Sequence, residues 1–336
     1  MNAAGSPPSN PPVFTPDVLA IDPHAVVGEI AQAIASQVQR TLRRRGAIVA
    51  MSGGIDSSVC AALAVRALGP DRVLGLILPE RDSSDDARRL AALLASTLGI
   101  ETVVEDIAPA LAAAGCYARQ DEAIRMVVPE YGEGWKCKIS VPSLLEGDRL
   151  TLFHVTAMSP TGEVRRALLP LAAYLQLVAA TNFKQRTRAM MAYYHADRLN
   201  YAVVGTPNRL EYDQGFFVKG GDGLADLKPI AHLYKTQVYA LASHLGIPDE
   251  IRLRPPTTDT YSMPQTQEEF YFALPYDRMD LCLYGHAHGV AAGDVAEAIG
   301  LTAVQVERVY RDIEAKRRAT RGLHLAPLLV EKVGEI

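Results

Sequence analysis

AIVAMSGGIDSS, residues 47–58, is the stretch of sequence that decides the fold. Its first five residues form a short apolar run typical of a buried strand, and a helical stretch follows from Ser57 to Leu68. Between them, Gly53 and Gly54 form a turn in which no Cβ keeps an anion away from the backbone amides. The amides at the start of the helix point toward the same place. The stretch therefore predicts a strand, a turn and a helix arranged to bind phosphate.

The turn differs from a Walker-type phosphate loop. It lacks the Gly-Lys-Ser/Thr ending, and with it the lysine that reaches the β- and γ-phosphates. The hydroxyls of Ser57 and Ser58 supply further donors for phosphate oxygens. This set of groups suits a pyrophosphate that leaves as one unit. The alternative is a purely structural turn in which Asp56 and Ser57 cap the helix.

Apolar runs and helical stretches alternate on both sides of this turn. An amphipathic helix is predicted before it, over residues 23–45. After it, strands are predicted at 73–78, 101–104 and 201–205, and helices at 85–98, 190–199 and 235–245. Such alternation is typical of parallel sheets flanked by helices. We therefore expect an α/β fold with a doubly wound, mainly parallel sheet and helices on both of its faces.

Three regions fall outside this alternation. Residues 1–22 begin with a stretch rich in Pro, Ser, Asn and Ala and are interpreted as a flexible N-terminal tail. Residues 129–170 contain alternating stretches around an SPTG turn at 159–162, which predicts an inserted segment with a hairpin. Residues 254–276 are rich in Pro, Thr and Gln and form a loop long enough to be a lid. Residues 23–336 are predicted to form a single domain that carries both the insertion and this loop.

The composition narrows the expected partners. The 38 acidic and 34 basic residues give a net charge of −4, which favours small molecules over nucleic acid. The four cysteines form no C-x-x-C pair of the kind that binds zinc or undergoes redox cycling, so we expect a reducing cytoplasm. The N-terminal residues lack the basic and apolar regions of a secretory signal. No stretch has the roughly 18 to 20 uninterrupted apolar residues of a membrane span, so no membrane partner is expected.

Further blocks of sequence carry a family resemblance. The turn resembles the SGG-x-DS loop of the N-type ATP pyrophosphatase superfamily. The blocks GTPNRLE, residues 205–211, and GFFVKGGDGLAD, residues 215–226, resemble those of NAD synthetases. The similarity continues through LYKTQ at 233–237 and LGIP at 245–248. The chain is therefore similar to the NAD synthetase family, which implies an adenine nucleotide alpha hydrolase-like fold.

The resemblance implies an ATP-dependent ligase that amidates deamido-NAD to NAD. In that reaction the nicotinate carboxylate attacks the α-phosphate of ATP and releases pyrophosphate, and ammonia then displaces AMP from the acyl adenylate. Glutamine-dependent members carry a separate nitrilase-like domain, for which the residues before the first strand are too few. The resemblance thus implies the ammonia-dependent type, with ammonia free in solution or delivered by a separate protein. It also implies a homodimer, and the amphipathic face of residues 23–45 either contacts the second subunit or packs on its own sheet.

The resemblance also implies roles for individual residues. ATP is expected at Ser52, Gly53, Gly54, Asp56, Ser57, Ser58, Thr206, Lys235 and Thr257. Deamido-NAD is expected at Arg188, Lys219, Asp226 and Lys316. Mg²⁺ is expected between Asp56 and Glu211, since carboxylates bind this hard cation through oxygen. Asp56 and Lys235 are expected to be catalytic, because Lys235 offers a cation to phosphates that gain negative charge.

Some features leave other interpretations open. Ala315 stands where the family typically has a histidine, and the insertion can reshape the acyl pocket. The alternatives are an amide ligase of this family that acts on a different carboxylate, and a nucleotide-binding protein without catalysis. Taken singly, residues such as Glu211, Lys235 and Arg188 can also be ordinary surface charges. His286 and His288 are interpreted as part of a polar loop, because i, i+2 spacing without a third partner is a weak metal signal.

Overall fold

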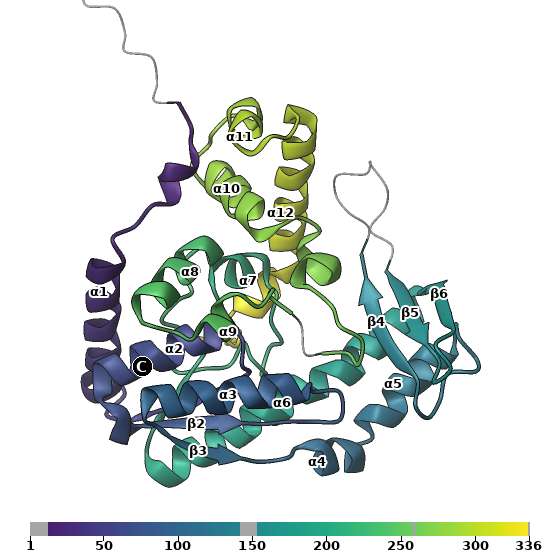
Figure 1. The fold of residues 1–336 in the computed structure, drawn as a ribbon, viewed down its shortest axis with the longest axis horizontal. Helices are drawn as coiled ribbons and strands as arrows, with labels where there is room; N and C mark the ends of the chain where they lie inside the picture. The colour runs from purple at the N-terminus through teal and green to yellow at the C-terminus, as the bar shows by residue number, and fades with distance from the viewer. Residues whose placement is uncertain (1–12, 142–152, 258–259, 335–336) are drawn as a thin grey trace, which may run out of the picture.

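The central sheet is parallel, as the sequence predicted. The computed structural model describes residues 13–141, 153–257 and 260–334 (Figure 1). The sheet has the strand order β3-β2-β1-β7 and consists of β1 (Ala47–Ala50), β2 (Val73–Ile77), β3 (Glu101–Val104) and β7 (Ala202–Val204). In register, Ala47 of β1 lies opposite Val73 of β2 and Ala202 of β7. The stretch that decides the fold therefore enters the sheet as an inner strand.

Helices cover both faces of this sheet, which confirms the doubly wound arrangement. One face carries α1 (Pro23–Ser36), α2 (Ile55–Leu68), α3 (Asp85–Leu98) and α8 (Lys235–His244), and the other carries α4 (Ala108–Ala113), α5 (Cys116–Arg125) and α6 (Leu171–Leu199). Successive side chains of β1 point to opposite faces of the sheet. Val49 packs in the core under α2, and Ile48 packs in the core under α6. Both are fully buried, which explains why the strands are continuous apolar runs.

The first long helix packs within the chain. Val27, Ile30 and Ile34 of α1 are buried in the core that α2 and α8 share. Of the two possibilities for this amphipathic face, the structure therefore shows packing on its own domain. Within the described residues, the helical stretch Pro16–Thr41 is long and apolar enough to count as a candidate membrane span by length and composition, a test that core helices of soluble proteins also pass.

The winding of the sheet changes direction between β1 and β7. From β1 the chain runs through α2 to β2 on one side, whereas β7 lies on the other side of β1. In open α/β sheets, ligands bind outside the carboxyl ends of the strands at such a switch point. The glycine turn after β1 and the residues after β7 therefore meet at the expected place for a site.

The helix predicted at 190–199 is much longer in the structure. α6 spans Leu171–Leu199, 29 residues, and ends at Asn200, whose left-handed φ of 58° stops it. Ala173 packs in one core near its start, and Ala192 packs in another near its end. Because small alanines make many of these contacts, the apolar periodicity of α6 is weak, and its first half was not recognisable as a helix.

The predicted insertion contains a three-stranded antiparallel sheet. Its strands are β4 (Lys136–Ser140), β5 (His154–Met158) and β6 (Val164–Leu168), paired in this order. The predicted hairpin is confirmed between β5 and β6, where the Ser159 hydroxyl accepts the amide hydrogen of Glu163 at 3.0 Å. β4 was not predicted. The residues between β4 and β5, 142–152, lie outside the described part of the chain.

A group of helices at the top of Figure 1 connects to the N-terminal part of the chain. It consists of α10 (Tyr276–Ala287), α11 (Ala292–Ile299) and α12 (Ala303–His324), which pack with α7 (Arg209–Gln214). Leu19, in the 3₁₀ turn η1 (Pro16–Leu19), is buried in the same core, and its carbonyl oxygen accepts a hydrogen bond from Gln237 Nε2 at 3.1 Å. The packed region therefore begins earlier than expected from a tail at 1–22, of which residues 1–12 lie outside the described part.

The expected lid-like loop, residues 254–276, has contacts of its own; its described residues, 254–257 and 260–276, are called the lid segment below. Thr257 and Thr266 form a β-bridge across it. Gln265 is buried, and its Nε2 donates to the carbonyl oxygen of Ile139 in β4. The lid segment is thereby attached to the antiparallel sheet. The remaining short elements are η2 (Gln37–Thr41), η3 (Pro70–Arg72), α9 (Asp249–Arg252) and η5 (Glu268–Phe272).

Candidate active site

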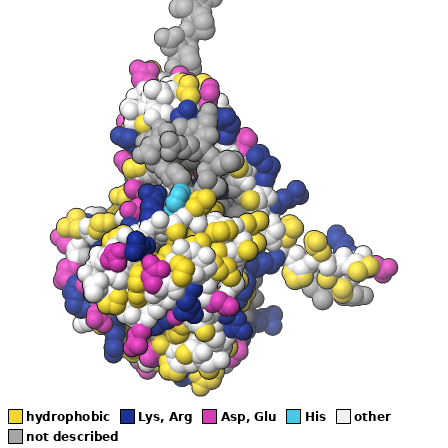
Figure 2. Space-filling model, turned by 90° about the vertical axis from the view of Figure 1, so that its right-hand side faces the viewer, with side chains coloured by type: hydrophobic (Ala, Val, Ile, Leu, Met, Phe, Trp, Pro, Cys, Tyr) yellow, Lys and Arg dark blue, Asp and Glu magenta, His cyan; other side chains and the backbone are white. Residues whose placement is uncertain are grey.

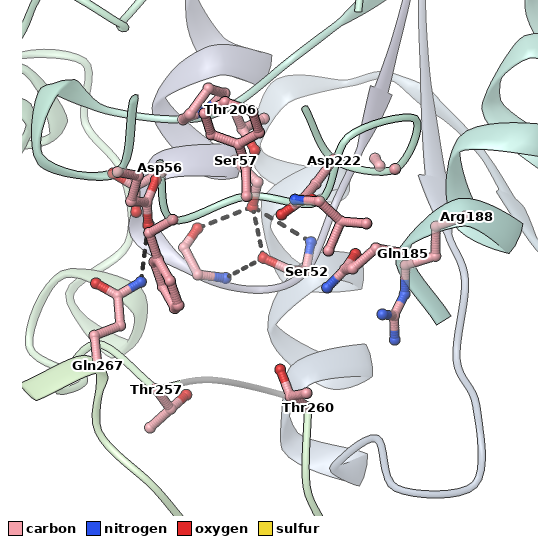
Figure 3. A pocket seen from close by; sticks show the side chains of 18 of the residues that line it. Ser52, Asp56, Ser57, Gln185, Arg188, Thr206, Asp222, Thr257, Thr260 and Gln267 are labelled. Atoms are coloured by element: carbon pink, nitrogen blue, oxygen red, sulfur yellow. Dashed lines mark hydrogen bonds between the residues drawn. The ribbon is translucent and has the colours of Figure 1, made fainter. Parts of the chain in front are cut away.

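A cavity of about 480 Å³ lies at the carboxyl ends of β1 and β7 (Figure 3). The glycine turn, the stretch after β7, α6 and the lid segment form its walls. Figure 3 shows Ser52 and Ser57 of the turn in the middle, Arg188 of α6 to one side, and Thr257 and Gln267 of the lid segment below. The cavity is therefore enclosed by segments that are distant in sequence.

Serine hydroxyls hold the glycine turn in shape. Ser52 Oγ lies 3.1 Å from Ser57 Oγ and accepts the amide hydrogen of Gly54 at 3.2 Å. The hydroxyls of Ser57 and Ser58 both donate to the Gly54 carbonyl oxygen, at 3.1 and 2.8 Å. Ser52 and Ser57 also face the cavity, whereas Ser58 is fully buried. The structure thus assigns Ser58 to the support of the turn.

Most residues expected to hold ATP line the cavity. They are Ser52, Gly54, Asp56, Ser57, Thr206, Lys235 and Thr257. Gly53 does not line it but sets the path of the turn, with a φ of 74°. A Cβ at Gly53 would lie 2.5 Å from the carbonyl oxygen of Ala87 in α3. Only glycine fits there, because any side chain would meet both backbone strain and the backbone of α3.

Asp56 and Lys235 form a buried ion pair beside the turn. The Lys235 ammonium donates to Asp56 Oδ2, and Asn208 Nδ2 donates to Asp56 Oδ1 at 3.1 Å. Burial alone would lower the pKa of Lys235, but the charges of Asp56 and Glu211 raise it. Lys235 is therefore a cation held inside the protein, next to the glycine turn.

Glu211 is the second carboxylate of this cluster. Its Oε2 accepts the amide hydrogen of Asn208 at 3.1 Å at the start of α7, and its Oε1 accepts from Gln267 Nε2 of the lid segment at 2.9 Å. Burial, and then the negative charge of Asp56, raise the pKa of Glu211 to about 8. Near neutral pH Glu211 therefore holds a proton in the free protein, while the charges of Asp56 and Lys235 balance each other.

A divalent cation would replace this proton, because it favours the charged form of both carboxylates. Mg²⁺ usually binds through one or two carboxylates and completes its coordination with substrate phosphates and water. Asp56 and Glu211 offer such a pair at the wall of the cavity. Within the described ranges, no group of three or more His, Cys, Asp and Glu side chains is placed to hold a metal by itself. A cation here would therefore need the phosphates of a bound nucleotide as further ligands.

A carboxylate of α10 fixes the start of α8. Asp280 accepts the amide hydrogens of Lys235 at 3.2 Å and Thr236 at 2.7 Å. Burial raises the pKa of Asp280 to about 6, although these hydrogen bonds act to lower it. A carboxylate at a helix N-terminus satisfies amides that have no partner within the helix. Asp280 thereby determines where Lys235 enters the cavity.

Of the four residues expected at the acyl substrate, the structure brings Arg188 to the cavity. Lys219 Nζ donates to the carbonyl oxygens of Gly322 at 2.9 Å and Leu325 at 3.2 Å. Asp226 accepts the amide hydrogen of Val203 at 2.8 Å and the hydroxyl hydrogen of Tyr193 at 3.2 Å. Lys316 Nζ donates to the Tyr271 carbonyl oxygen at 2.8 Å and pairs with Asp312 at 2.7 Å. These three side chains bind other parts of the same chain.

Several cavity residues were not singled out from the sequence. Gln185, Asp222, Thr260 and Gln267 all line it and are visible in Figure 3. Asp222 lies within the block at 215–226, so the resemblance contained a signal for it. The sequence contained no such signal for Gln267, because its contact with Glu211 depends on the path of the lid segment.

The histidines and the segment around Ala315 lie among the C-terminal helices. His286 Nε2 lies 3.3 Å from Glu314 Oε1, and Arg317 pairs with Asp213 at 2.6 Å. The ring of His288 stacks on Tyr284. None of these side chains is among those that line the cavity. The departure at Ala315 therefore lies outside the wall of the cavity.

Comparison with protein families gives one match that covers most of the chain. The NAD synthase family model matches residues 26–128 and 155–320. The gap between the two matched parts, 129–154, contains β4 and falls within the predicted insertion. An NH(3)-dependent NAD(+) synthetase of Mesorhizobium japonicum is 61% identical, over 95% of this chain and 100% of the relative. The protein of the same name from Rhizobium meliloti is 58% identical, over 98% of both chains.

Solved structures share the fold. An NMN synthetase from Francisella tularensis aligns with a TM-score of 0.63 at 22% identity, covering 92% of this chain and 99% of that chain. An NH3-dependent NAD synthetase from Campylobacter jejuni aligns with a TM-score of 0.58 at 19% identity, covering 93% of this chain and 100% of that chain. At these identities the likeness concerns the fold. It agrees with the parallel sheet flanked by helices.

Proposed function

The chain belongs to the NAD synthase family, and from this premise we propose that its cavity amidates the nicotinate carboxylate of deamido-NAD with ammonia, while ATP is cleaved to AMP and pyrophosphate. The protein is a ligase that forms a carbon–nitrogen bond. The observation that carries the proposal is the buried ion pair of Lys235 and Asp56 beside the glycine turn, at the switch point of the sheet. The identity of 57–61% to the ammonia-dependent synthetases, over nearly the full chain, supports the choice of substrate and nitrogen donor.

The first step activates a poor electrophile. The carboxylate oxygen attacks the α-phosphorus of ATP, and the bond to the bridging oxygen of pyrophosphate breaks. Charge then grows on the departing pyrophosphate, where the amides of the turn, the hydroxyls of Ser52 and Ser57, and the ammonium of Lys235 receive it. Because the amides of the turn and the ammonium of Lys235 are held in place before the reaction, they stabilise this charge with little reorganisation. Thr206 and Thr257, which also line the cavity, complete the proposed ATP site.

The second step forms the amide. Ammonia attacks the carbonyl carbon of the acyl adenylate, AMP leaves with the oxygen that the carboxylate contributed, and a proton is released. No covalent enzyme intermediate is needed. The mixed anhydride is also open to water, so the cavity has to exclude water while ammonia enters. The walls formed by α6 and the lid segment serve this purpose in our proposal.

We propose that Asp56 and Glu211 hold Mg²⁺ together with the phosphates of ATP. The two carboxyl groups at the cavity wall support this assignment, since a cation would take the place of the proton that the raised pKa of Glu211 keeps there. The ion would neutralise charge on the pyrophosphate as it leaves. Removal of Mg²⁺ with a chelator should abolish AMP release, and titration with Mg²⁺ should restore it. Unchanged turnover without divalent cations would contradict the assignment.

We propose that Arg188 binds the phosphates of deamido-NAD, the substrate that carries the carboxylate. Its guanidinium extends from α6 toward the cavity, as Figure 3 shows, and its Nε donates to the Leu78 carbonyl oxygen at 3.4 Å. Contact of Lys219, Asp226 and Lys316 with deamido-NAD stays a prediction. Their present bonds hold the end of α12, the end of β7 and the lid segment.

A reaction with defined substrates tests the function. Purified protein with ATP, Mg²⁺, ammonium and deamido-NAD should form NAD and AMP in equal amounts. A parallel reaction with nicotinate mononucleotide in place of deamido-NAD tests whether the protein prefers a smaller substrate with the same nicotinate ring. AMP release with another carboxylate but not with deamido-NAD would favour the alternative ligase. Binding of ATP without any turnover would favour the non-catalytic alternative.

We further propose that the protein acts as a homodimer in the cytoplasm, with ammonia either free or delivered by a separate protein. Exposed apolar side chains on α6, Leu171, Leu175, Met190 and Tyr194, support a subunit contact. Figure 2, which faces the side of the molecule where β4–β6 lie, shows apolar side chains gathered across the middle of this face. Light scattering should therefore give the mass of two chains. A mass of one chain at assay concentration would contradict the dimer.

A further inference from the structure

A buried lysine behind the cavity connects three segments of the chain. Lys184 lies on α6 and is 1% exposed. Its Nζ lies 3.1 Å from Glu80 Oε1 and 2.5 Å from Asp82 Oδ2, and it donates to the carbonyl oxygen of Thr260 at 2.9 Å. Glu80 and Asp82 follow β2, and Thr260 belongs to the lid segment. One ammonium therefore joins a helix, a loop and the lid segment.

Each of these segments is a wall of the cavity, although Lys184 itself does not line it. Next to Lys184 on α6, Gln185 lines the cavity, and Ser83 and Ser84 do so in the loop after β2. Thr260 lines it from the lid segment, and Figure 3 shows Thr260 and Gln185 reaching the cavity from different elements. Lys184 is thus placed to set the distance between walls without touching the substrate.

The charges around Lys184 are balanced inside the protein. Glu80 also accepts the hydroxyl hydrogen of Tyr117 at 3.0 Å, and Asp82 pairs with Arg81 at 3.2 Å. Burial alone would raise the pKa of Asp82, but Lys184 and Arg81 lower it below its usual value. Two carboxylates thus face two cations. Removal of Lys184 leaves buried negative charge without compensation, and such a cluster rearranges or opens.

We propose that Lys184 is a positioning residue that holds the lid segment against the loop after β2, so that the acyl adenylate reacts with ammonia and not with water. The inference rests on the proposed function and adds the residue that keeps water out. Attack of ammonia on the acyl carbon gives the carboxamide and AMP. Attack of water on the same carbon gives the carboxylate and AMP. Both reactions release AMP, and only the first yields NAD.

The ratio of AMP to NAD therefore measures the exclusion of water. Wild-type protein should give one AMP per NAD. Lys184→Met should give about two or more AMP per NAD, because a loosened wall admits water to the mixed anhydride. Raising the ammonium concentration should bring the ratio back toward one, since ammonia and water compete for the same carbon. Lys136→Met is the matched control: the same replacement at an exposed lysine of β4 should leave the ratio at one.

A second variant keeps the test decisive if Lys184→Met fails to fold. Asp82→Asn preserves the shape of the side chain and removes one ionic partner of Lys184. It should raise the ratio as well, by a smaller factor. Loss of folded protein lowers AMP and NAD together and leaves their ratio unchanged. Folded variants with a ratio of one would therefore overturn the inference, while absence of NAD with the wild-type protein would overturn the proposed function itself.

Discussion

Lys235 shows how strongly the site depends on the surroundings of single side chains. Its ammonium is 1% exposed, so it carries a charge that the fold must compensate. Burial would lower its pKa, but Asp56 pairs with it, and the carboxylates of Asp56 and Glu211 raise the pKa. In our proposal the same ammonium also serves the departing pyrophosphate, while Asn208 bonds Asp56 and holds it in place. The cation is thus positioned before the substrate arrives.

Replacement of Lys235 tests this role. Lys235→Met should lower kcat by about 10²–10³, a loss typical for removal of one group that stabilises transition-state charge. Lys235→Arg keeps the charge and should retain more activity than Lys235→Met. The measurement is AMP release at saturating ATP, with circular dichroism to verify the fold. Equal activity of Lys235→Met and wild type would remove Lys235 from the mechanism.

At this scale, the sequence predicted residues that lie in contiguous motifs. The turn at 52–58 was recognisable from its strand, turn and helix, whereas Glu211 and Lys235 were recognisable because they lie in blocks that resemble the NAD synthetase family. Gln267 and Asp280 were not, since each reaches the site from a segment that local pattern does not place. Asp280 contacts the amide of Lys235 only because α10 packs against the start of α8. Tertiary contacts of this kind leave no periodic signal.

The turn between β1 and α2 is the element whose shape is most restricted. Gly53→Ala should lower the free energy of unfolding by about 2–4 kcal/mol, because it adds backbone strain and a close contact with Ala87. Gly99→Ala is the matched control. Gly99 also has a positive φ, 65°, but a Cβ there meets nothing within 4 Å, so strain alone remains, about 1–2 kcal/mol. Urea denaturation measures the free energy of unfolding of both variants. Equal losses would show that the backbone at Ala87 moves away from the added Cβ at no measurable cost.

The junction of α10 and α8 should respond to pH. The pKa of Asp280 in the folded protein is about 6, raised from about 3.9 in the unfolded chain. The stability that this group contributes is therefore fully present below about pH 3.9 and is lost as pH rises through about 6. Between these values, the wild-type free energy of unfolding should fall relative to that of Asp280→Asn by about 2–3 kcal/mol. Parallel stability curves for the two proteins across this window would contradict the raised pKa.

Elements differed in how far the sequence predicted them. The sheet strands were recognisable because both faces of the sheet are covered and each strand is an apolar run between turns. The first half of α6 was not, since its buried positions alternate between alanine and polar residues such as Thr181 and Lys184. Lys184 is buried only because Glu80 and Asp82 meet it there. A buried charge in a helix looks like a solvated face until its partners are known.

On the scale of the whole molecule, the cavity lies between three parts of the fold, each with its own hydrophobic core: the parallel sheet, the antiparallel sheet and the C-terminal helices. The sheet supplies the turn, the antiparallel strands support the start of α6, and the C-terminal helices supply Asp280. The lid segment runs between the last two, since Gln265 bonds to β4 and Lys316 of α12 bonds to Tyr271. Fold class and hairpin were predictable from the sequence, whereas this junction was not, because its contacts join residues that lie 45 to 126 positions apart.

The central claim is that the carboxylate is activated by adenylation in this cavity, and an isotope measurement tests it most directly. Deamido-NAD labelled with ¹⁸O in its nicotinate carboxylate is converted with ATP, Mg²⁺ and ammonium, and the AMP is analysed by mass spectrometry. Attack of the carboxylate on the α-phosphorus predicts that each AMP formed carries one oxygen atom from the carboxylate. NAD formation with unlabelled AMP would contradict the acyl adenylate and the account built on it.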